Sequence, residues 1–196
     1  MQRTLHYFKE FTIKMGIRQY SEKDFDGIVQ LIQSIQKTDC WPIVYPSGWD
    51  EKRIKEEFEP MRNYHDPLFL VSESEEGITG LIAGHDLKSF IIDEVPHLDH
   101  KFREFNSICN AVFYQRDIMI HPAHQKGFSG LRLFQALRRH ALSIGYDQVV
   151  TRTPPENLRG INFFEKLGYV PIFSDNNPKR IYFNNYLSSY DYLSRR

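Results

Sequence analysis

The stretch DIMIHPAHQKGFSGLRLFQALRRHA, residues Asp117 to Ala141, decides the fold that the sequence predicts. It begins inside a β-type run, Val112 to Ile120, which ends before Pro122. A polar loop with Gly127 and Gly130 follows, and then apolar residues recur every four positions, as in an amphipathic helix. A strand, a glycine-bearing loop and a helix N-terminus leave several backbone N–H groups unpaired and pointing one way, with the helix dipole behind them. The stretch therefore predicts a cradle for an anion such as a phosphate or a pyrophosphate.

Two motifs of the chain resemble those of the GCN5-related N-acetyltransferase family, which transfers an acetyl group from acetyl-coenzyme A (acetyl-CoA) to an amine. IMIHPAHQKGFSG (118–130) is similar to the family's fourth strand, V-x-P and Q/R-x-x-G-x-G/A. NLRGINFFEKLGY (157–169) is similar to its N-x-x-A-x-x-F-Y-x-x-x-G-F. Gln125 and Gly130 match the first motif without a gap, but Phe128 stands at its middle glycine. Gly127 would fill that role only through a shifted loop.

The resemblance implies that acetyl-CoA is the co-substrate and that both motifs contact it. The loop from Gln125 to Leu131 would meet the pyrophosphate through backbone amides, and Lys126 would add a positive charge. The backbone of Ile118 to Ile120 would pair with the pantetheine arm, and the N–H of Met119 or Ile120 would polarise the thioester carbonyl. The residues implied in cofactor binding are Ile118, Met119, Ile120, Gln125, Lys126, Gly127, Phe128, Ser129, Gly130, Leu131, Asn157 and Phe163.

Within the second motif, Asn157 would hydrogen-bond the pantetheine arm and Phe163 would pack near the cofactor. A helix cap is an equally good interpretation of Asn157, because it follows two prolines and precedes a helical pattern. Many family members carry a tyrosine in the F-Y pair, which protonates the leaving thiolate. Phe164 stands there in this chain, so that acid is missing.

The candidate catalytic residues are Tyr114 and Asp117. Some family members carry a glutamate base on the fourth strand, and an ungapped comparison places Tyr114 at that position. Asp117 is the nearest carboxylate, and strand alternation predicts that it points to the opposite face of the sheet from Tyr114. Both residues are equally compatible with a purely structural role in the strand.

Alternating helix and strand patterns predict an α/β (α+β) fold, with a mixed, mostly antiparallel sheet flanked by helices. The resemblance implies that strands 112–120 and 148–153 splay apart and hold coenzyme A in the cleft. Helices are expected after Ser21, Asp50, Gly130 and Asn157. Ser21 and Asp24 have the spacing of a capping box that opens the first helix. Its apolar stripe is expected at Ile28, Leu31, Ile32 and Ile35. The expected strands are 17–20, 68–71, 77–84, 112–120, 148–153, 169–173 and 180–186.

Two further segments are candidates for an acceptor site. Residues 39–49 hold two prolines, a glycine and large aromatics, and they line a pocket or form a hydrophobic lid over the core. Residues 85–110 are longer than a hairpin connection needs and are expected to be a polar insertion that sets the choice of acceptor. Its acidic and histidine residues match no metal-ligand spacing, so a solvated insertion is favoured over acidic recognition of a cationic amine.

The 196 residues predict one domain over 15–187, with an N-terminal extension at 1–14 and a C-terminal tail at 188–196. The 25 basic and 25 acidic residues cancel, which argues against a protein built to hold nucleic acid or an anionic membrane. Cys40 and Cys109 lack any ligand spacing and indicate free thiols of a cytoplasmic protein. No apolar run is long enough for a membrane helix, and no signal-peptide core is evident.

The sequence thus predicts an acetyl-CoA-dependent N-acetyltransferase without a metal, acting on a primary amine of a small molecule or a peptide. Direct attack is expected, because neither cysteine lies in the cofactor segments. One alternative is a non-catalytic module of the same fold that senses acyl-CoA, and another is an interaction protein whose cleft is filled by its own side chains. The sequence leaves the oligomeric state open, a homodimer included.

Overall fold

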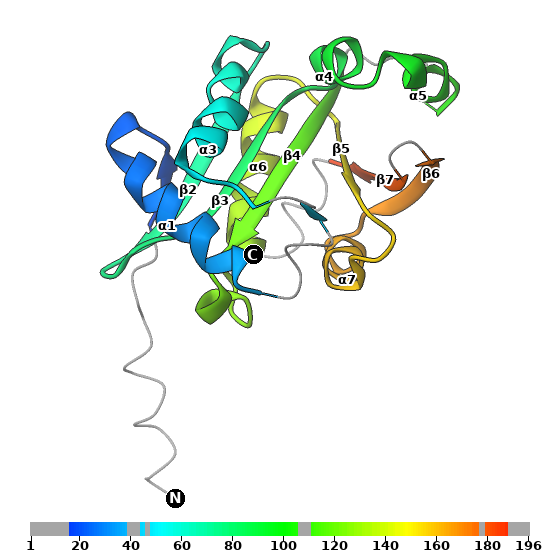
Figure 1. The fold of residues 1–196 in the computed structure, drawn as a ribbon. Coiled ribbons are helices and arrows are strands. Elements are labelled where there is room, and N and C mark those ends of the chain that lie inside the picture. The colour runs from blue at the N-terminus through cyan, green and yellow to red at the C-terminus, as the bar shows by residue number, and fades with distance from the viewer. Residues whose placement is uncertain (1–15, 39–43, 46–47, 106–110, 177–178, 188–196) are drawn as a thin grey trace, which may run out of the picture.

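The computed structural model describes residues 16–38, 44–45, 48–105, 111–176 and 179–187. These residues form one mixed sheet with helices on both faces (Figure 1). The strands are β1 (Gly16–Gln19), β2 (Leu68–Ser74), β3 (Gly77–Asp86), β4 (Val112–Ile120), β5 (Gln148–Thr153), β6 (Val170–Asn176) and β7 (Lys179–Tyr186). The helices are α1 (Phe25–Gln36), α3 (Glu51–Phe58), α4 (Leu87–Asp93), α5 (Asp99–Phe105), α6 (Ser129–Ser143) and α7 (Leu158–Lys166).

The seven strands lie in the order β1-β2-β3-β4-β5-β7-β6. All neighbours are antiparallel except β4 and β5, which are parallel. This parallel pairing covers only Val112 to Tyr114 on β4, although both strands continue beyond it. The predicted fold class and the splay between these two strands are therefore confirmed.

Helices α1 and α3 cover one face of the sheet, and α6 and α7 cover the other (Figure 1). The predicted apolar stripe of α1 is buried, with Ile28, Leu31 and Ile32 at most 1% exposed. On the other face, Leu133 and Leu137 of α6 are completely buried. Each such side chain contributes roughly 1.5–3 kcal/mol by leaving water, so these two faces hold the helices against the sheet.

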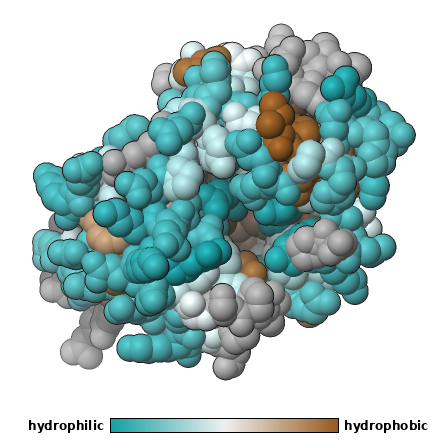
Figure 2. Space-filling view, turned by 45° about the horizontal axis from the view of Figure 1, so that its top comes forward, coloured by the Kyte–Doolittle hydropathy of each residue, from teal (hydrophilic) through white to brown (hydrophobic). Residues whose placement is uncertain are grey.

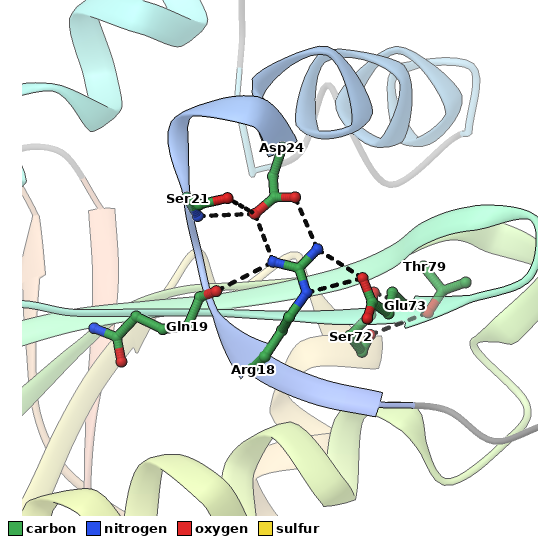
Figure 3. Close-up of polar contacts among 7 residues, drawn as sticks. All are labelled: Arg18, Gln19, Ser21, Asp24, Ser72, Glu73 and Thr79. Carbon is green, nitrogen blue, oxygen red and sulfur yellow. Dashed lines mark hydrogen bonds and ion pairs between the residues drawn. The ribbon is translucent and has the colours of Figure 1, made fainter.

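An arginine-centred cluster joins β1, the start of α1 and β2 (Figure 3). Arg18 binds both carboxylate oxygens of Asp24, at 2.6 and 2.8 Å, and Glu73 Oε2 with two nitrogens, at 2.6 and 2.9 Å. Asp24 also accepts the Ser21 backbone N–H at 2.8 Å, as the predicted capping box requires. The beginning of α1 is thereby tied to the edge of the sheet.

The insertion expected at residues 85–110 is present between β3 and β4, but the prediction that it is solvated is wrong for its described part. Strand β3 continues to Asp86, so His85 is completely buried, and Asp86 caps α4 by accepting the Ser89 N–H at 2.8 Å. Phe90 is also completely buried, within a third core beneath α4 and α5. Leu87, Phe90 and Ile91 have the spacing of an amphipathic helix, and this short pattern is hidden among charged residues in the sequence. Residues 106–110, with Cys109, lie outside the described residues, as does Cys40.

Candidate active site

A pocket of about 330 Å³ opens where β4 and β5 diverge, on the side of the sheet that carries α3 and α4. In the space-filling view, the molecule is hollowed near the centre of this face, with mainly hydrophilic side chains around the hollow (Figure 2). The lining comes from strands β4, β5 and β7, from helix α3 and the segment before it, and from the residue that follows α4. The lining residues are Val44, Tyr45, Trp49, Arg53, Glu57, Glu94, Tyr114, Arg116, Asp117, Arg152, Pro154 and Arg180.

A β-bulge places the two candidate catalytic residues on the same face of the sheet. Asp117 is paired with Ala83 of β3 and Gln115 with Gly84, so Arg116 is an extra residue in β4. Such an extra residue shifts the alternation of side chains by one position. Tyr114, Arg116 and Asp117 all line the pocket, and the prediction of opposite faces was wrong.

Arg116 is the centre of a partly buried cluster of ions in this pocket. It donates to Glu57 Oε2 at 2.6 Å and to the Glu57 carbonyl oxygen at 2.7 Å. Its Nε lies farther from two other carboxylates, 3.7 Å from Asp117 and 3.9 Å from Glu94. Burial opposes the charge of Arg116, but these carboxylates outweigh it and raise its pKa. Arg116 therefore holds a fixed positive charge among carboxylates that it only partly satisfies.

Arg152 of β5 forms the second ion pair of the pocket. Its Nη2 donates to Glu94 Oε2 at 2.8 Å, and its guanidinium carbon lies 4.8 Å from the centre of the Phe90 ring. Burial raises the pKa of Glu94, while Arg116 and Arg152 oppose this shift. Glu94 comes from the segment that the sequence indicated as acceptor-determining, so part of that segment borders the pocket.

Tyr45 donates its hydroxyl to Asp117 Oδ1 in a short hydrogen bond. Burial, followed by the charge of Asp117, raises the pKa of Tyr45, so the tyrosine keeps its proton. Trp49 packs on Tyr45 with ring centres 4.6 Å apart and is 7% exposed. Both interpretations of the 39–49 segment hold for its described part, because Tyr45 lines the pocket while Trp49 also belongs to the core.

Tyr114, the other candidate, is 1% exposed and stacks on Phe90 with ring centres 3.8 Å apart. Burial raises the pKa of Tyr114, whereas Arg152 opposes this. Tyr114 therefore carries a proton at neutral pH and can donate it in a hydrogen bond, and its catalytic role stays a prediction.

The predicted anion cradle lies at the N-terminus of α6, on the other side of the splay. Its first backbone hydrogen bond runs from the Arg132 N–H to the Phe128 carbonyl oxygen, 2.9 Å. The N–H groups of Gly130 and Leu131 precede this bond, so they lack partners within the helix and face outward with the helix dipole behind them. The Gly127 N–H donates to the His124 carbonyl oxygen at 3.2 Å, so it already has a partner within the loop.

Phe128 fits its position without strain in the backbone. Its φ of −89° and ψ of 7° lie in a region open to all residues, so the loop needs no glycine there. The side chain is 70% exposed. The departure of Phe128 from the motif changes the surface of the cradle and not its backbone.

Gly130 joins the two motifs by close packing. A Cβ atom there would lie 3.0 Å from Phe163 Cζ of α7 and 3.7 Å from Ile120 Cγ1 of β4. Three predicted cofactor residues from separate elements, Ile120, Gly130 and Phe163, are thus brought together. Contacts of Gln125, Lys126 and Ser129 with a cofactor stay predictions; the Gln125 side chain donates to the Ile120 carbonyl oxygen at 3.1 Å.

The backbone of β4 beyond Tyr114 faces the cleft at alternate residues. Just after β4, the His121 N–H donates to the carbonyl oxygen of Thr79 in β3 at 2.8 Å, so the N–H and C=O of Met119, two residues earlier, also point toward β3. Those of Ile118 and Ile120 then point to the opposite side, where β5 has diverged. Of the two amides predicted to polarise a thioester, the one of Ile120 faces the cleft.

Asn157 is a helix cap in this structure. Its Oδ1 accepts the Gly160 N–H at 3.0 Å, and its Nδ2 donates to Thr153 Oγ1 at the end of β5, 2.9 Å away. The capping interpretation is confirmed, and its contact with a cofactor stays a prediction. Phe164 is 5% exposed and packs against Tyr169, with ring centres 5.5 Å apart, so it belongs to the core.

The sequence analysis missed most of the pocket's charged lining. Arg116 stands in the polar triplet Gln115–Asp117, which interrupts an otherwise apolar strand, and this interruption was the available signal. Glu57, Arg152 and Arg180 resemble ordinary surface residues in the sequence, because their elements meet only in the folded chain.

The described residues contain no cluster of three or more His, Cys, Asp or Glu that could hold a metal ion. Within the same residues, no helix has both the length and the apolar composition needed to cross a bilayer.

The acetyltransferase (GNAT) family model matches residues 36–169 of this chain. No curated protein matches it. Among solved structures, an N-acetyltransferase from Staphylococcus aureus Mu50 is similar, with a TM-score of 0.65 and 15% identity over 89% of this chain and 99% of that one. The protein yncA from Salmonella typhimurium, solved with its cofactor acetyl-CoA, has a TM-score of 0.59 and 18% identity over 89% and 95%. The paia N-acetyltransferase from Thermoplasma acidophilum, in complex with coenzyme A, has a TM-score of 0.62 and 13% identity over 88% and 98%.

Proposed function

The chain belongs to the acetyltransferase (GNAT) family, and on this premise we propose that it transfers the acetyl group of acetyl-CoA to the nitrogen of a primary amine. The observation that carries the proposal is the arrangement of two sites around one splay. The cradle at Gly130 lies on the α6 side of the sheet, and the charged pocket at Asp117 lies on the α3 side. A thioester held between β4 and β5 is therefore open to an amine that enters from the pocket.

The residues of the cradle fit the cofactor. Phosphates bind well to the free N–H groups of a helix N-terminus, which Gly130 and Leu131 supply. The N–H and C=O groups of Ile118 and the N–H of Ile120 would suit the amides of a pantetheine arm, while the Ile120 carbonyl oxygen accepts the Gln125 side chain. Two structures of similar fold, from Salmonella typhimurium and Thermoplasma acidophilum, contain acetyl-CoA and coenzyme A.

In the proposed reaction the amine nitrogen bonds to the acetyl carbon, the carbon–sulfur bond breaks, and coenzyme A leaves as a thiolate that takes up a proton. Asp117 is the proposed acceptor of the proton that the amine loses, because its carboxylate lines the pocket and Tyr45 orients it. Tyr114 is the proposed donor to the thiolate, because it retains its proton and lies on the same face. The Ile120 N–H would stabilise the negative charge that develops on the carbonyl oxygen.

Calorimetric binding of acetyl-CoA to the wild type and to Gly130→Asp tests the cofactor site. The substituted side chain would collide with Phe163 and add a negative charge beside the phosphates, so we expect affinity to fall at least about 100-fold. Gln135→Asp is the matched control, since it adds the same charge at an exposed position of the same helix. Circular dichroism would establish that both variants fold, and equal affinities in the two would refute the cradle.

Turnover is tested by release of free coenzyme A thiol with a panel of primary amines. Asp117→Asn should lower kcat at least about 100-fold while acetyl-CoA affinity stays within threefold, because the carboxylate acts on the acceptor side. A kcat that Asp117→Asn leaves unchanged would remove Asp117 from the mechanism.

A second candidate function, an acyl-CoA sensor without catalysis, is motivated by Phe164. Phe164 is buried in the core at the position where many family members supply a proton to the thiolate. Tight acetyl-CoA binding with no thiol release across the amine panel would favour the sensor over the transferase.

A further inference from the structure

The pocket carries one more positive charge than its own carboxylates balance. Four arginines and three carboxylates line it among the described residues. Arg53 and Arg116 both pair with Glu57, and Arg152 pairs with Glu94. Asp117 is held by Tyr45 and lies next to Arg116. These interactions leave the fourth arginine, Arg180, without a counterion.

Arg180 extends from β7, two residues before Tyr182, which pairs with Arg152 of β5. Residues two apart on a strand share a face, so the two arginines are diagonal neighbours above the same side of the sheet. The guanidinium of Arg180 donates to the Lys179 carbonyl oxygen at 2.8 Å. Asp175 of β6 is its partner across the strand pair, but the Asp175 carboxylate lies 3.1 Å from His97 Nε2, and no ion pair within 4.0 Å joins Arg180 to a carboxylate of the described residues. Burial and the charge of Arg152 lower the pKa of Arg180.

A half-buried guanidinium beside a second arginine is an unfavourable arrangement that an anion would relieve. The three carboxylates of the pocket cannot supply that anion, because each already faces another partner. The volume of about 330 Å³ lies at the small end for ligand sites, which favours a small molecule over a protein segment.

We infer that the acceptor is an amine that also carries a carboxylate, such as an amino acid, and that Arg180 binds this carboxylate. This inference rests on the proposed function and assigns the substrate class of its acceptor site. The carboxylate pairs with Arg180, the amine lies toward Asp117, and the apolar part of the acceptor contacts Val44, Trp49 and Pro154. Carboxylate recognition by Arg180 and proton removal at Asp117 thus fix the two ends of one small zwitterion.

The test compares amino acids with their carboxamides, in which the carboxylate is replaced by a neutral group of similar shape. The panel holds α-, β- and γ-amino acids, with acetyl-CoA and thiol release as the readout. The wild type should acetylate its best amino acid with kcat/KM roughly 10- to 100-fold above the carboxamide, as expected for one charged hydrogen-bonded pair. The amine of the carboxamide is less basic than that of the amino acid, so more of it is unprotonated and reactive. This difference alone would favour the carboxamide, so it cannot produce the expected preference for the amino acid.

Arg180→Met should remove the preference by lowering kcat/KM for the amino acid and leaving the carboxamide within about threefold. Arg180→Lys should restore part of it, because the charge returns without the two-pronged geometry. Arg139→Met is the matched control, since it removes an exposed arginine of α6 far from the pocket lining.

Saturation-transfer NMR of the same amino acids and carboxamides, in the presence of coenzyme A, reports binding independently of turnover. Amino-acid binding that Arg180→Met abolishes, without any thiol release, would uphold the carboxylate site and overturn the transferase. Thiol release with amino acids and carboxamides alike, unaffected by Arg180→Met, would uphold the transferase and overturn the inference.

Discussion

Two clusters of this protein each place carboxylates around one arginine, but they differ in how closely the carboxylates are bound to it. Arg18 makes four hydrogen bonds of 2.6–2.9 Å to Asp24 and Glu73, at a corner of the fold where its side chain is 35% exposed (Figure 3). Arg116 is 17% exposed and has one such carboxylate bond, to Glu57, while Asp117 and Glu94 stay 3.7 and 3.9 Å away.

The difference separates a structural cluster from a functional one. Both carboxylates around Arg18 are bound to it directly, at a corner of the fold outside the pocket, so that cluster fastens β1 to α1 and β2. The carboxylates around Arg116 are held close to a positive charge in a pocket without being fully bound to it. A ligand with its own charged groups can therefore compete for them, and three experiments test this contrast.

The largest expected effect follows from Arg116→Leu. Glu57 and Glu94 would keep Arg53 and Arg152, but Asp117, at 7% exposed, would lose its nearby positive charge and keep only Tyr45. A buried carboxylate that loses its cation is strongly destabilising, so the free energy of unfolding should fall by about 3–5 kcal/mol. Denaturant-induced unfolding followed by tryptophan fluorescence measures it. Arg53→Leu is the control, because Arg53 pairs with the same Glu57 from a 54% exposed position and should cost no more than about 1 kcal/mol. Equal losses in both variants would mean that the pocket is as well solvated as the surface.

The second effect concerns His85, which lies behind the pocket wall with its ring centre 5.5 Å from that of Tyr114. Burial lowers the pKa of His85 to about 4 from its ordinary 6.5. Below pH 6.5 His85 binds a proton in the unfolded chain but not in the folded chain. The free energy of unfolding therefore falls as the pH drops from about 6.5 to about 4. The total loss should be about 3 kcal/mol.

Unfolding curves of His85→Gln and of His100→Gln, measured between pH 7 and pH 4, test this expectation. His85→Gln should flatten the dependence in that window, whereas the exposed His100 should leave it unchanged. An unaltered slope in His85→Gln would show that the space behind the pocket wall is hydrated.

The smallest effect is expected for Arg18→Leu, at about 1–2 kcal/mol, because solvent screens this cluster. The loss should shrink in 1 M salt, in contrast to that of Arg116→Leu. Arg18 holds the pKa of Asp24 well below its usual range, so the Arg18 cluster contributes fully above about pH 4 and is lost only as the pH falls further. Urea unfolding at low and high salt measures this, and a salt-independent loss would place Arg18 with the buried cluster.

Much of the fold was predictable, because its signals are local. Ser21 and Asp24 form the predicted capping box, Asp50 caps α3 by accepting the Arg53 N–H at 2.8 Å, and β4 and β5 begin and end at the predicted residues. The exceptions are α4 and α5, helices of seven residues each, in which Leu87, Phe90 and Phe102 are too few to stand out from their charged neighbours.

By itself, the sequence determined the strand, the loop and the helix that form the cradle, since backbone N–H groups at a helix N-terminus need only the correct order of elements. Which residues line the pocket, and which charges they meet there, follows only from the tertiary structure. Arg116 lines the pocket because it is the extra residue of a β-bulge. Strict alternation of side chains does not predict this bulge, since the extra residue is defined only by the pairing of β4 with β3. Glu57, Arg152 and Arg180 come from α3, β5 and β7, and the charge that each meets depends on distances across the folded chain.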